Sequence, residues 1–330
     1  MVDLSGTALR LMERGKGILA ADESVHTADH RLHEYGITDG EEMRRRFHDL
    51  FLTAPGAEDY LSGAILFTET LLQKGSDKKL FPNSLSARGI LPGVKVDLGT
   101  EPLHDGSLEL ITKGLIGLSE RLEEYKKAGA AFTKWRAVIA IEGDVLPTKQ
   151  CLVENAKRLA SYAHEVQKAG MVPILEPEVL LSGVHGRLRA RDVIAETLKT
   201  VLAACEDQAV DLSGIIIKTA MALTGSKSRK KDTPEEVADA TVEALMASVP
   251  KSVPGIVFLS GGQEPDQATE NLRATVRRAR EAGAPWPLTF SYARALQNEA
   301  LTVWEGKEEN IPAARDAFIA RLKKVTSAIA

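Results

Sequence analysis

The chain has 330 residues, 44% of them hydrophobic and 27% charged, which is enough to bury either the core of one α/β barrel or the cores of two smaller domains. A formal net charge of −4 gives no overall attraction for nucleic acid, and no stretch is long and apolar enough to suggest a membrane span. The two cysteines, Cys151 and Cys205, lack CxxC spacing, so we expect neither a disulfide framework nor a zinc knuckle. We therefore expect a cytoplasmic protein, with neither nucleic acid nor a membrane among its partners.

Amphipathic segments recur along the chain. The first fifteen residues carry both charge signs and predict a helix; they lack the basic start and apolar centre of a secretion signal. A second helix is expected to start near Thr38–Glu41, and a third covers 151–169 and ends at Gly170, a favourable C-cap. A fourth begins with Thr233 as N-cap, Pro at the next position and Glu236 as its capping-box partner. A final helix is expected over about 312–328.

Short apolar runs rich in Ile, Val and Leu alternate with these segments. Each opens near Gly or Pro and ends on a polar residue, which is typical of parallel strands buried on both faces. We predict strands within GILAADES (17–24), GAILFTET (63–70), PGVKVDLG (92–99), AAFTKWRAVIA (130–140), GMVPILEPE (170–178), GIIIKTAM (214–221), PGIVFLSGG (254–262) and WPLTFSYAR (286–294).

The alternation of strand and helix, about eight times over, predicts the fold. Parallel strands need helical crossovers, and eight such strands can close into a cylinder. No linker or abrupt change of composition divides the chain, so we predict one domain, residues 1–330, folded as a single (β/α)8 TIM barrel with an extra N-terminal helix and a C-terminal helix. A doubly wound open sheet is the alternative, which the lack of GxGxxG after the first run disfavours.

Polar residues gather near the ends of these runs. The carboxyl ends of barrel strands share one face, where active sites are built, so these residues are expected to converge. Residues two apart in a strand point to the same side, so charged pairs such as Lys134 and Arg136 can meet Glu176 and Glu178 and lower the cost of burial. The converging set is Asp22, Ser24, Glu69, Lys95, Asp97, Lys134, Arg136, Glu176, Glu178, Lys218, Ser260, Gly261, Ser291 and Arg294.

Lys218 follows three consecutive isoleucines and has two interpretations. Burial and nearby cations both disfavour an ammonium, and a neutral amine can attack a carbonyl carbon to form a Schiff base, which promotes cleavage of the adjacent carbon–carbon bond. Alternatively, Lys218 is a structural ion-pair partner of Glu176 or Glu178. In the first interpretation, a buried Glu supplies the proton transfers of imine formation and Asp22 is the candidate base for cleavage. Leu259–Gly262 and Arg294 suggest a phosphate site, although Gly261 and Gly262 also suit an ordinary tight turn.

Several of these segments, in order along the chain, resemble class I fructose-bisphosphate aldolases, the metal-independent enzymes that form a Schiff base. The similar segments are GKGILAADES (15–24), VKVDLG (94–99), GLSERLEEYKKAGAAFTKWR (117–136), VPILEPE (172–178), GIIIK (214–218), FLSGGQ (258–263) and LTFSYARALQ (288–297). The resemblance implies reversible cleavage of fructose 1,6-bisphosphate into dihydroxyacetone phosphate and glyceraldehyde 3-phosphate, in glycolysis and gluconeogenesis. It also implies no cofactor or metal, sugar phosphates as partners, and a homo-oligomer, commonly a tetramer.

The resemblance also assigns roles to residues. Lys218 resembles the Schiff-base lysine, Glu176 the acid/base that expels water from the carbinolamine, and Asp22 the group that handles the C4 hydroxyl proton. Lys134 and Glu178 would lie beside the imine. The resemblance implies that Ser260, Gly261 and Arg294 bind the C1 phosphate, with Ala293 near it, and that Ser291 is a further substrate or phosphate contact. It implies that Ser24, Lys95 and Arg136, helped by Arg31, face the sugar hydroxyls or the C6 phosphate.

The chain departs from the family pattern at several positions. VHTADHRL (25–32) stands where animal-type members have TGSIAKRL, so that Thr27 and His30 replace a serine and a lysine; this leaves open the preference between substrates with one and two phosphates. Ala293 adds a methyl group where the family has glycine, and Thr219–Met221 replaces Pro-Asn-Met. Animal-type members continue into a tail that ends in tyrosine, whereas this sequence stops at Ala330, so we expect another group or water to exchange the enamine proton.

Three other functions are alternatives for this sequence. His26, His30 and His33 have helical spacing and are the only hint of a metal-dependent aldolase. A transaldolase-like barrel enzyme shares the lysine chemistry, but FLSGGQ and FTKWR argue against it. A non-catalytic scaffold would use the basic stretch SKSRKKDTPEE (226–236) to bind an acidic partner, although a solvated loop is the simpler interpretation.

Overall fold

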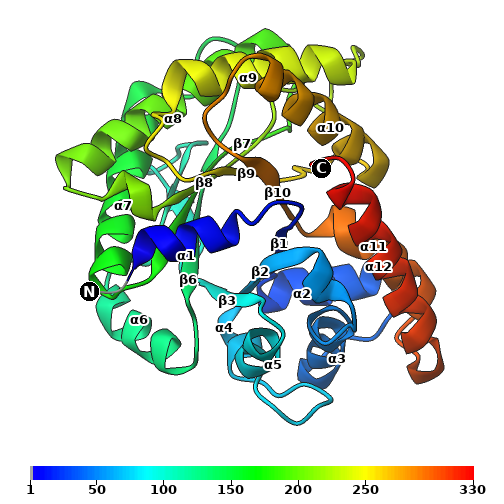
Figure 1. The fold of residues 1–330 in the computed structure, drawn as a ribbon. Helices are drawn as coiled ribbons and strands as arrows, with labels where there is room; N and C mark the ends of the chain where they lie inside the picture. Colours follow the sequence, from blue (N-terminus) through cyan, green and yellow to red (C-terminus); the bar gives the residue numbers. More distant parts are fainter. Residues whose placement is uncertain (1–2) are drawn as a thin grey trace.

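The centre of the molecule is a closed barrel of parallel strands, seen in a computed structural model that describes residues 3–330 (Figure 1). The (β/α)8 prediction is confirmed, since each predicted apolar run supplies one strand. The open-sheet alternative is wrong, because the first strand pairs with both the second and the last and so closes the cylinder. Around the barrel the strands are β1 (Gly17–Ala21), β10 (Leu288–Tyr292), β9 (Ile256–Phe258), β8 (Ile216–Thr219), β7 (Val172–Val179), β6 (Phe132–Ile139), β3 (Leu91–Lys95) and β2 (Leu61–Leu66).

Helices surround this barrel and cover the outer faces of its strands (Figure 1). Short 3-10 turns lie at Ala57–Asp59, Leu212–Gly214 and Glu308–Asn310. In chain order the helices are α1 (Leu4–Leu11), α2 (Val25–Glu34), α3 (Glu41–Leu52), α4 (Thr68–Leu71), α5 (Phe81–Ala87), α6 (Leu118–Lys127), α7 (Lys149–Lys168), α8 (Arg187–Asp207), α9 (Pro234–Ser248), α10 (Pro265–Glu281), α11 (Arg294–Trp304) and α12 (Ile311–Thr326).

The predicted helix starts are largely confirmed. The Thr233 hydroxyl accepts from the Glu236 N–H at 3.2 Å, and the Glu236 carboxylate accepts from the Thr233 N–H at 3.0 Å, which completes the capping box of α9. Near residue 38 a helix does begin, but Gly40 is its N-cap and neither Thr38 nor Asp39 caps it. No helix in the described part of the chain combines the length and the hydropathy that a membrane span requires.

The N-terminal helix α1 closes the amino-terminal end of the barrel (Figure 1). Leu11 is fully buried against the inward-facing residues of the strands, among them Ile18, Phe132 and Val172. The Ser62 hydroxyl donates to the Leu11 carbonyl at 2.6 Å, which fixes the end of α1 to β2. The interior of the barrel at this end is therefore filled by apolar side chains.

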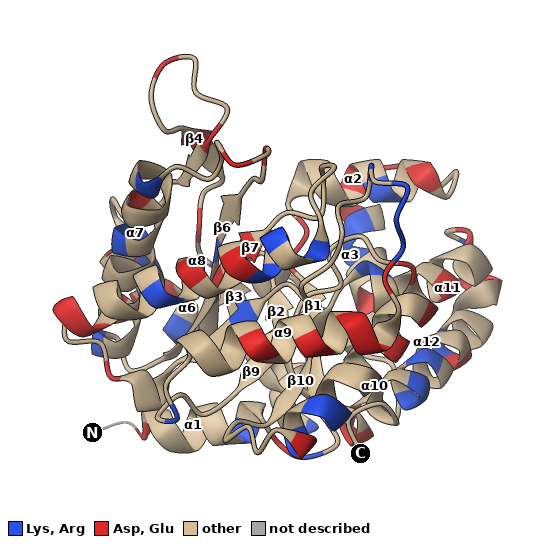
Figure 2. Ribbon diagram, turned by 90° about the horizontal axis from the view of Figure 1, so that it is seen from above, with Lys and Arg blue, Asp and Glu red and all other residues tan. Residues whose placement is uncertain are grey.

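One pair of strands was not predicted. The antiparallel strands β4 (Thr100–Pro102) and β5 (Leu110–Thr112) form a hairpin that projects from the side of the molecule opposite α1 (Figure 2). Each has only three residues, too few for an alternating pattern to stand out in the sequence. The hairpin follows β3 and therefore rises beside the carboxyl ends of the strands, where the polar residues gather.

Candidate active site

A cavity of about 840 Å³ opens at the carboxyl ends of the barrel strands. Side chains from nearly every strand end reach it, because all strands run in the same direction. Of the residues predicted to converge, all except Glu69 line it: Asp22, Ser24, Lys95, Asp97, Lys134, Arg136, Glu176, Glu178, Lys218, Ser260, Gly261, Ser291 and Arg294. Arg31 and Ala293, which the family resemblance implied, line it as well. Their convergence is thus confirmed, while the role of each stays a prediction.

Four charged side chains, three of them buried, form a continuous chain of contacts at the floor of this cavity. Lys218 on β8 lies with its Nζ 3.0 Å from Oε1 of Glu176 on β7. The other oxygen of Glu176 lies 3.0 Å from Nζ of Lys134 on β6, which in turn contacts Asp22 at 2.6 Å. Lys134 and Lys218 are each only 3% exposed. The floor therefore holds two ammonium groups and two carboxylates in mutual contact, as burial of charge requires.

The charges of this chain support one another. Burial alone would lower the pKa of the Lys134 ammonium, but the carboxylates of Asp22 and Glu176 outweigh it and raise that pKa. Burial alone would raise the pKa of Asp22 and Glu176, but the ammonium groups of Lys134 and Lys218 outweigh it and lower both values. Asp22 and Glu176 are therefore held in their charged carboxylate form.

Both interpretations of Lys218 are compatible with this geometry. The predicted ion pair with Glu176 is present, whereas Glu178 contacts Arg136 instead. The Nζ of Lys218 also lines the cavity, where a ligand carbonyl would meet it. The neighbour of Lys218 is thus settled, and its role as a nucleophile remains a prediction.

A second set of paired charges lies nearer the mouth. Arg136 donates from Nε to Glu178, and its side chain stays 40% exposed. Burial alone would lower the pKa of Arg136, but the nearby carboxylates, above all Glu178, outweigh it and raise that pKa. Lys95 contacts Asp97, whose other oxygen accepts from the Arg136 backbone N–H at 3.1 Å. The pair Lys134 and Glu176 thus lies deep in the cavity, and the pair Arg136 and Glu178, two residues further along β6 and β7, lies nearer its mouth. Both pairs are on the same side of their strands, as the alternation predicts.

The opposite wall has groups suited to an anion. Ser260 follows β9, and Gly261 and Gly262 adopt positive φ values of 58° and 90° that favour glycine. The Ser291 hydroxyl at the end of β10 is buried and has no hydrogen-bond partner within residues 3–330. Arg294 begins α11 and lines the cavity close to Gly262, so this wall presents hydroxyls, backbone N–H groups and a guanidinium.

The first loop, between β1 and α2, completes the wall next to Asp22. Ser24 is the N-cap of α2, and its hydroxyl accepts from the Thr27 N–H. The guanidinium of Arg31 is buried and donates to Glu23 at 2.9 Å, to Asn298 at 2.9 Å and to Gln297.

The lining of the cavity differs from the predicted set of site residues at a few positions. Glu69 does not line the cavity; Arg44 on α3 binds both of its oxygens at 2.8 Å and draws it outward. Glu23 and Thr27 line the cavity but were not among the predicted site residues. Glu23 gave no signal in the sequence, because its partners, Arg31 and His48, come from two different helices.

The histidines that suggested a metal have other neighbours. His30 lies 3.5 Å from Glu34, and His33 lies 3.2 Å from Asp39, both on the surface. Among residues 3–330 no three His, Cys, Asp or Glu side chains are grouped as a metal ion would require.

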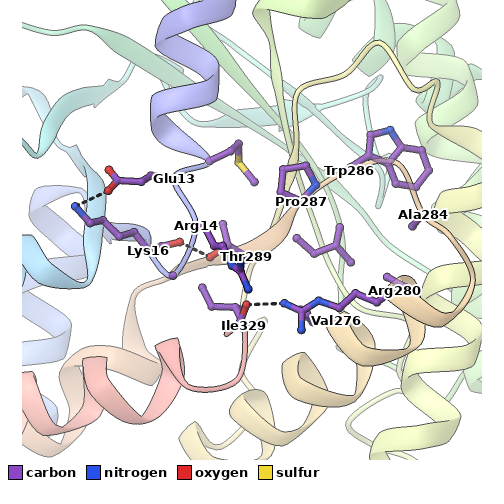
Figure 3. A pocket seen from close by; sticks show the side chains of 14 residues that line it. Glu13, Arg14, Lys16, Val276, Arg280, Ala284, Trp286, Pro287, Thr289 and Ile329 are labelled. Atoms are coloured by element: carbon purple, nitrogen blue, oxygen red, sulfur yellow. Dashed lines mark hydrogen bonds and ion pairs between the residues drawn. The ribbon is translucent and has the colours of Figure 1, made fainter.

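A smaller cavity of about 340 Å³ lies at the opposite end of the barrel, beside the loop that leads into β1 (Figure 3). Trp286 and Pro287 form one side, and Ile329 lies across from them, with its carbonyl accepting from Arg280 at 3.0 Å. Lys16 at its edge is paired with Glu13 at 3.0 Å. None of the predicted site residues lines this second cavity.

Known proteins resemble the whole chain. The sequence model of the glycolytic family described as fructose-bisphosphate aldolase class-I matches residues 3–330. The chain is 44% identical over 321 residues to a cytoplasmic isozyme of fructose-bisphosphate aldolase from Spinacia oleracea, covering 97% of this chain and 89% of the relative. It is 46% identical over 319 residues to fructose-bisphosphate aldolase B from Ovis aries, covering 96% and 87%.

A solved structure agrees with these relatives. Fructose-bisphosphate aldolase from Plasmodium falciparum, crystallised with TRAP and a small-molecule inhibitor, superimposes with a TM-score of 0.95 at 40% identity. The match covers 99% of this chain and 93% of that one.

Proposed function

The chain belongs to the class I fructose-bisphosphate aldolase family, and on this premise we propose a role for each residue of the cavity. The enzyme is a lyase that reversibly cleaves fructose 1,6-bisphosphate into dihydroxyacetone phosphate and glyceraldehyde 3-phosphate. The observation that carries the proposed mechanism is the chain of contacts from Lys218 through Glu176 and Lys134 to Asp22.

Imine formation is proposed for the Lys218 and Glu176 pair. Glu176 lies 3.0 Å from the Lys218 amine and takes its proton, which leaves a neutral amine to attack the C2 carbonyl of the substrate. The protonated Glu176 then returns the proton to the carbinolamine hydroxyl, which leaves as water, and the C2–nitrogen double bond forms. Lys134 beside Glu176 favours the carboxylate at the start and at the end of this cycle.

Carbon–carbon cleavage is proposed for Asp22. Its carboxylate accepts the C4 hydroxyl proton, the C3–C4 electron pair moves into the protonated imine, and glyceraldehyde 3-phosphate leaves while an enamine remains on Lys218. Contact with Lys134 holds Asp22 in its charged form. Glu178, paired with Arg136 nearer the mouth of the cavity, is proposed to adjust the electrostatic potential at the imine.

The two phosphates are proposed to bind at opposite walls of the cavity. The serine hydroxyls, the Gly261 region and a guanidinium suit the C1 phosphate, and the cations of β3 and β6 suit the hydroxyls and the C6 phosphate. The first wall comprises Ser260, Gly261, Ser291, Ala293 and Arg294; the second comprises Ser24, Arg31, Lys95 and Arg136.

Activity of a Lys218→Ala variant tests this mechanism. We expect it to lose cleavage of fructose 1,6-bisphosphate in an assay coupled to triose phosphate, because no other amine replaces the nucleophile. Lys227→Ala, in the exposed loop after β8, is the matched control and should retain activity, and EDTA should leave the wild type unaffected. Full activity of Lys218→Ala, or loss of activity with EDTA, would contradict the Schiff-base mechanism.

We also propose that residues 1–330 form one domain, that the protein assembles as a homo-oligomer, and that it acts in the cytoplasm. Closure of the barrel by its first and last strands supports the single domain. Exposed apolar residues on and after the projecting hairpin, Leu108 and Ile116, support an assembly, for which light scattering of the full chain is the test. Relatives named cytoplasmic and cytosolic isozymes support the location.

A further inference from the structure

A buried histidine that the proposed reaction does not use lies behind the second wall of the cavity, the wall that contains Ser24 and Arg31. His48 on α3 is only 1% exposed. Its Nδ1 lies 3.0 Å from the Thr70 hydroxyl on α4, and its Nε2 lies 3.6 Å from Oε2 of Glu23. Neither that Nε2 nor that Oε2 has a hydrogen-bond partner within residues 3–330, so the two atoms face only each other.

Glu23 connects this histidine to the cavity. It stands between Asp22 and Ser24, and its buried carboxylate accepts from Arg31 at 2.9 Å on the side away from His48. Burial alone would raise the pKa of Glu23, but the nearby His48 ring and the charge of Arg31 outweigh it and lower that value. Glu23 is therefore an anion fixed between two partners from neighbouring helices.

We propose that His48 is a positioning residue for the reaction. When the Thr70 hydroxyl donates to Nδ1, the Nε2–H of His48 points at Glu23 and fixes its carboxylate. Since Asp22 precedes Glu23, this contact sets where the Asp22 carboxylate lies relative to Lys134. The inference rests on the proposed role of Asp22 in carbon–carbon cleavage.

The same network reaches the opposite wall of the cavity. Arg31, held by Glu23, also donates to Gln297 and Asn298 on α11. Arg294, the first residue of that helix, lines the cavity at the proposed C1 phosphate site. Through Arg31, Glu23 therefore connects the loop that contains Asp22 to helix α11, which begins with Arg294. His48 contacts Glu23 on the side away from Arg31.

Two substitutions separate this role from packing. In His48→Asn the amide replaces Nδ1 and keeps the Thr70 contact, whereas in His48→Gln the amide reaches the place of Nε2 and keeps the Glu23 contact. We expect His48→Asn to lower kcat for cleavage by about 10-fold, because the second oxygen of Glu23 loses its polar neighbour. Borohydride trapping of dihydroxyacetone phosphate on Lys218 should proceed as in the wild type, because Lys218 and Glu176 are untouched. His48→Gln should restore most of the cleavage, and the surface variant His33→Asn is the control.

The results that would overturn the proposal are distinct. Wild-type cleavage by His48→Asn would exclude a positioning role, and so would equal loss of cleavage and of trapping in both His48 variants. If His48→Asn does not fold, Glu23→Gln decides: slowed cleavage with intact trapping supports the proposal, and unchanged kcat contradicts it. Absence of any wild-type adduct on Lys218 would instead contradict the proposed mechanism, so the two claims fail separately.

Discussion

At the scale of single residues, Lys134 is the side chain on which the charge balance of the cavity floor depends. It contacts both carboxylates, Asp22 at 2.6 Å and Glu176 at 3.0 Å. Removing one partner from a buried ion pair leaves the other without compensation, which costs far more than an exposed pair is worth. Lys134 therefore contributes to folding as well as to the proposed chemistry.

Lys134→Met, similar in length but uncharged, should lower the free energy of unfolding at pH 7 by about 3–5 kcal/mol and also slow cleavage. The pKa values of Asp22 and Glu176 are lowered in the folded protein, so their charge interactions stabilise it above their ordinary range and are lost as the pH falls through the lowered values. The difference between wild type and variant should therefore shrink below about pH 4. Urea unfolding at pH 7 and below about pH 4 measures this difference in the free energy of unfolding. Lys199→Met, at an exposed position, is the control. A difference that stays constant with pH would count against this account.

At this scale the sequence predicts residue types better than partners. Alternation along β6 and β7 brought Lys134 and Arg136 to the side of Glu176 and Glu178, as expected. It left open which carboxylate meets Lys218, because the answer depends on how neighbouring strands are staggered around the barrel. Glu69 was misplaced because its partner, Arg44, belongs to a helix distant in sequence, and His48 gave no signal for the same reason.

At the scale of helices and strands, the start of α9 is specified locally. Thr233 and Glu236 satisfy two N–H groups that the helix geometry leaves free, and Pro234 occupies the first helical position, where its missing N–H costs nothing. Signals of this kind are contained within four residues, so the sequence predicted this start, together with the eight apolar strands. The β4–β5 hairpin depends on its surroundings rather than on its own three-residue strands, and it was missed.

Thr233→Ala should lower the free energy of unfolding by about 1 kcal/mol, because the capping hydroxyl is lost while its surroundings stay the same. The value of kcat should not change, since Thr233 is not among the residues that line the cavity. Urea unfolding measures the loss, and Thr200→Ala, inside α8, serves as a control that should cost less. Equal losses for both variants would show that the capping box is not what stabilises this helix.

At the scale of the whole molecule, the two ends of the barrel are specialised. One end carries the charged cavity, and the other is filled by apolar side chains and closed by α1. Since α1 packs against strands from both halves of the chain, it should unfold with the barrel rather than before it. The extra N-terminal helix was predicted from its amphipathic pattern, but its place across the barrel end was not, because no local signal states which surface a helix covers.

Leu11→Ala should cost about 2–5 kcal/mol of unfolding free energy, because the side chain is fully buried and leaves a cavity in the barrel end. Cleavage of substrate should continue at the wild-type rate in the folded fraction, since the site lies at the opposite end. Leu9→Ala on the same helix, where the side chain is 58% exposed, should cost little. Thermal unfolding and steady-state kinetics on both variants check this, and a fall in kcat for Leu11→Ala without a fall in stability would contradict the division of the two ends.

The claim at the centre of this account is that the amine of Lys218 becomes covalently bound to the ketose. Incubation with fructose 1,6-bisphosphate, reduction by borohydride and mass mapping of the peptides measures this directly. The account predicts a triose-phosphate adduct on the peptide that contains Lys218, and none in Lys218→Ala. An adduct on another lysine, or no adduct in an actively cleaving enzyme, would contradict it.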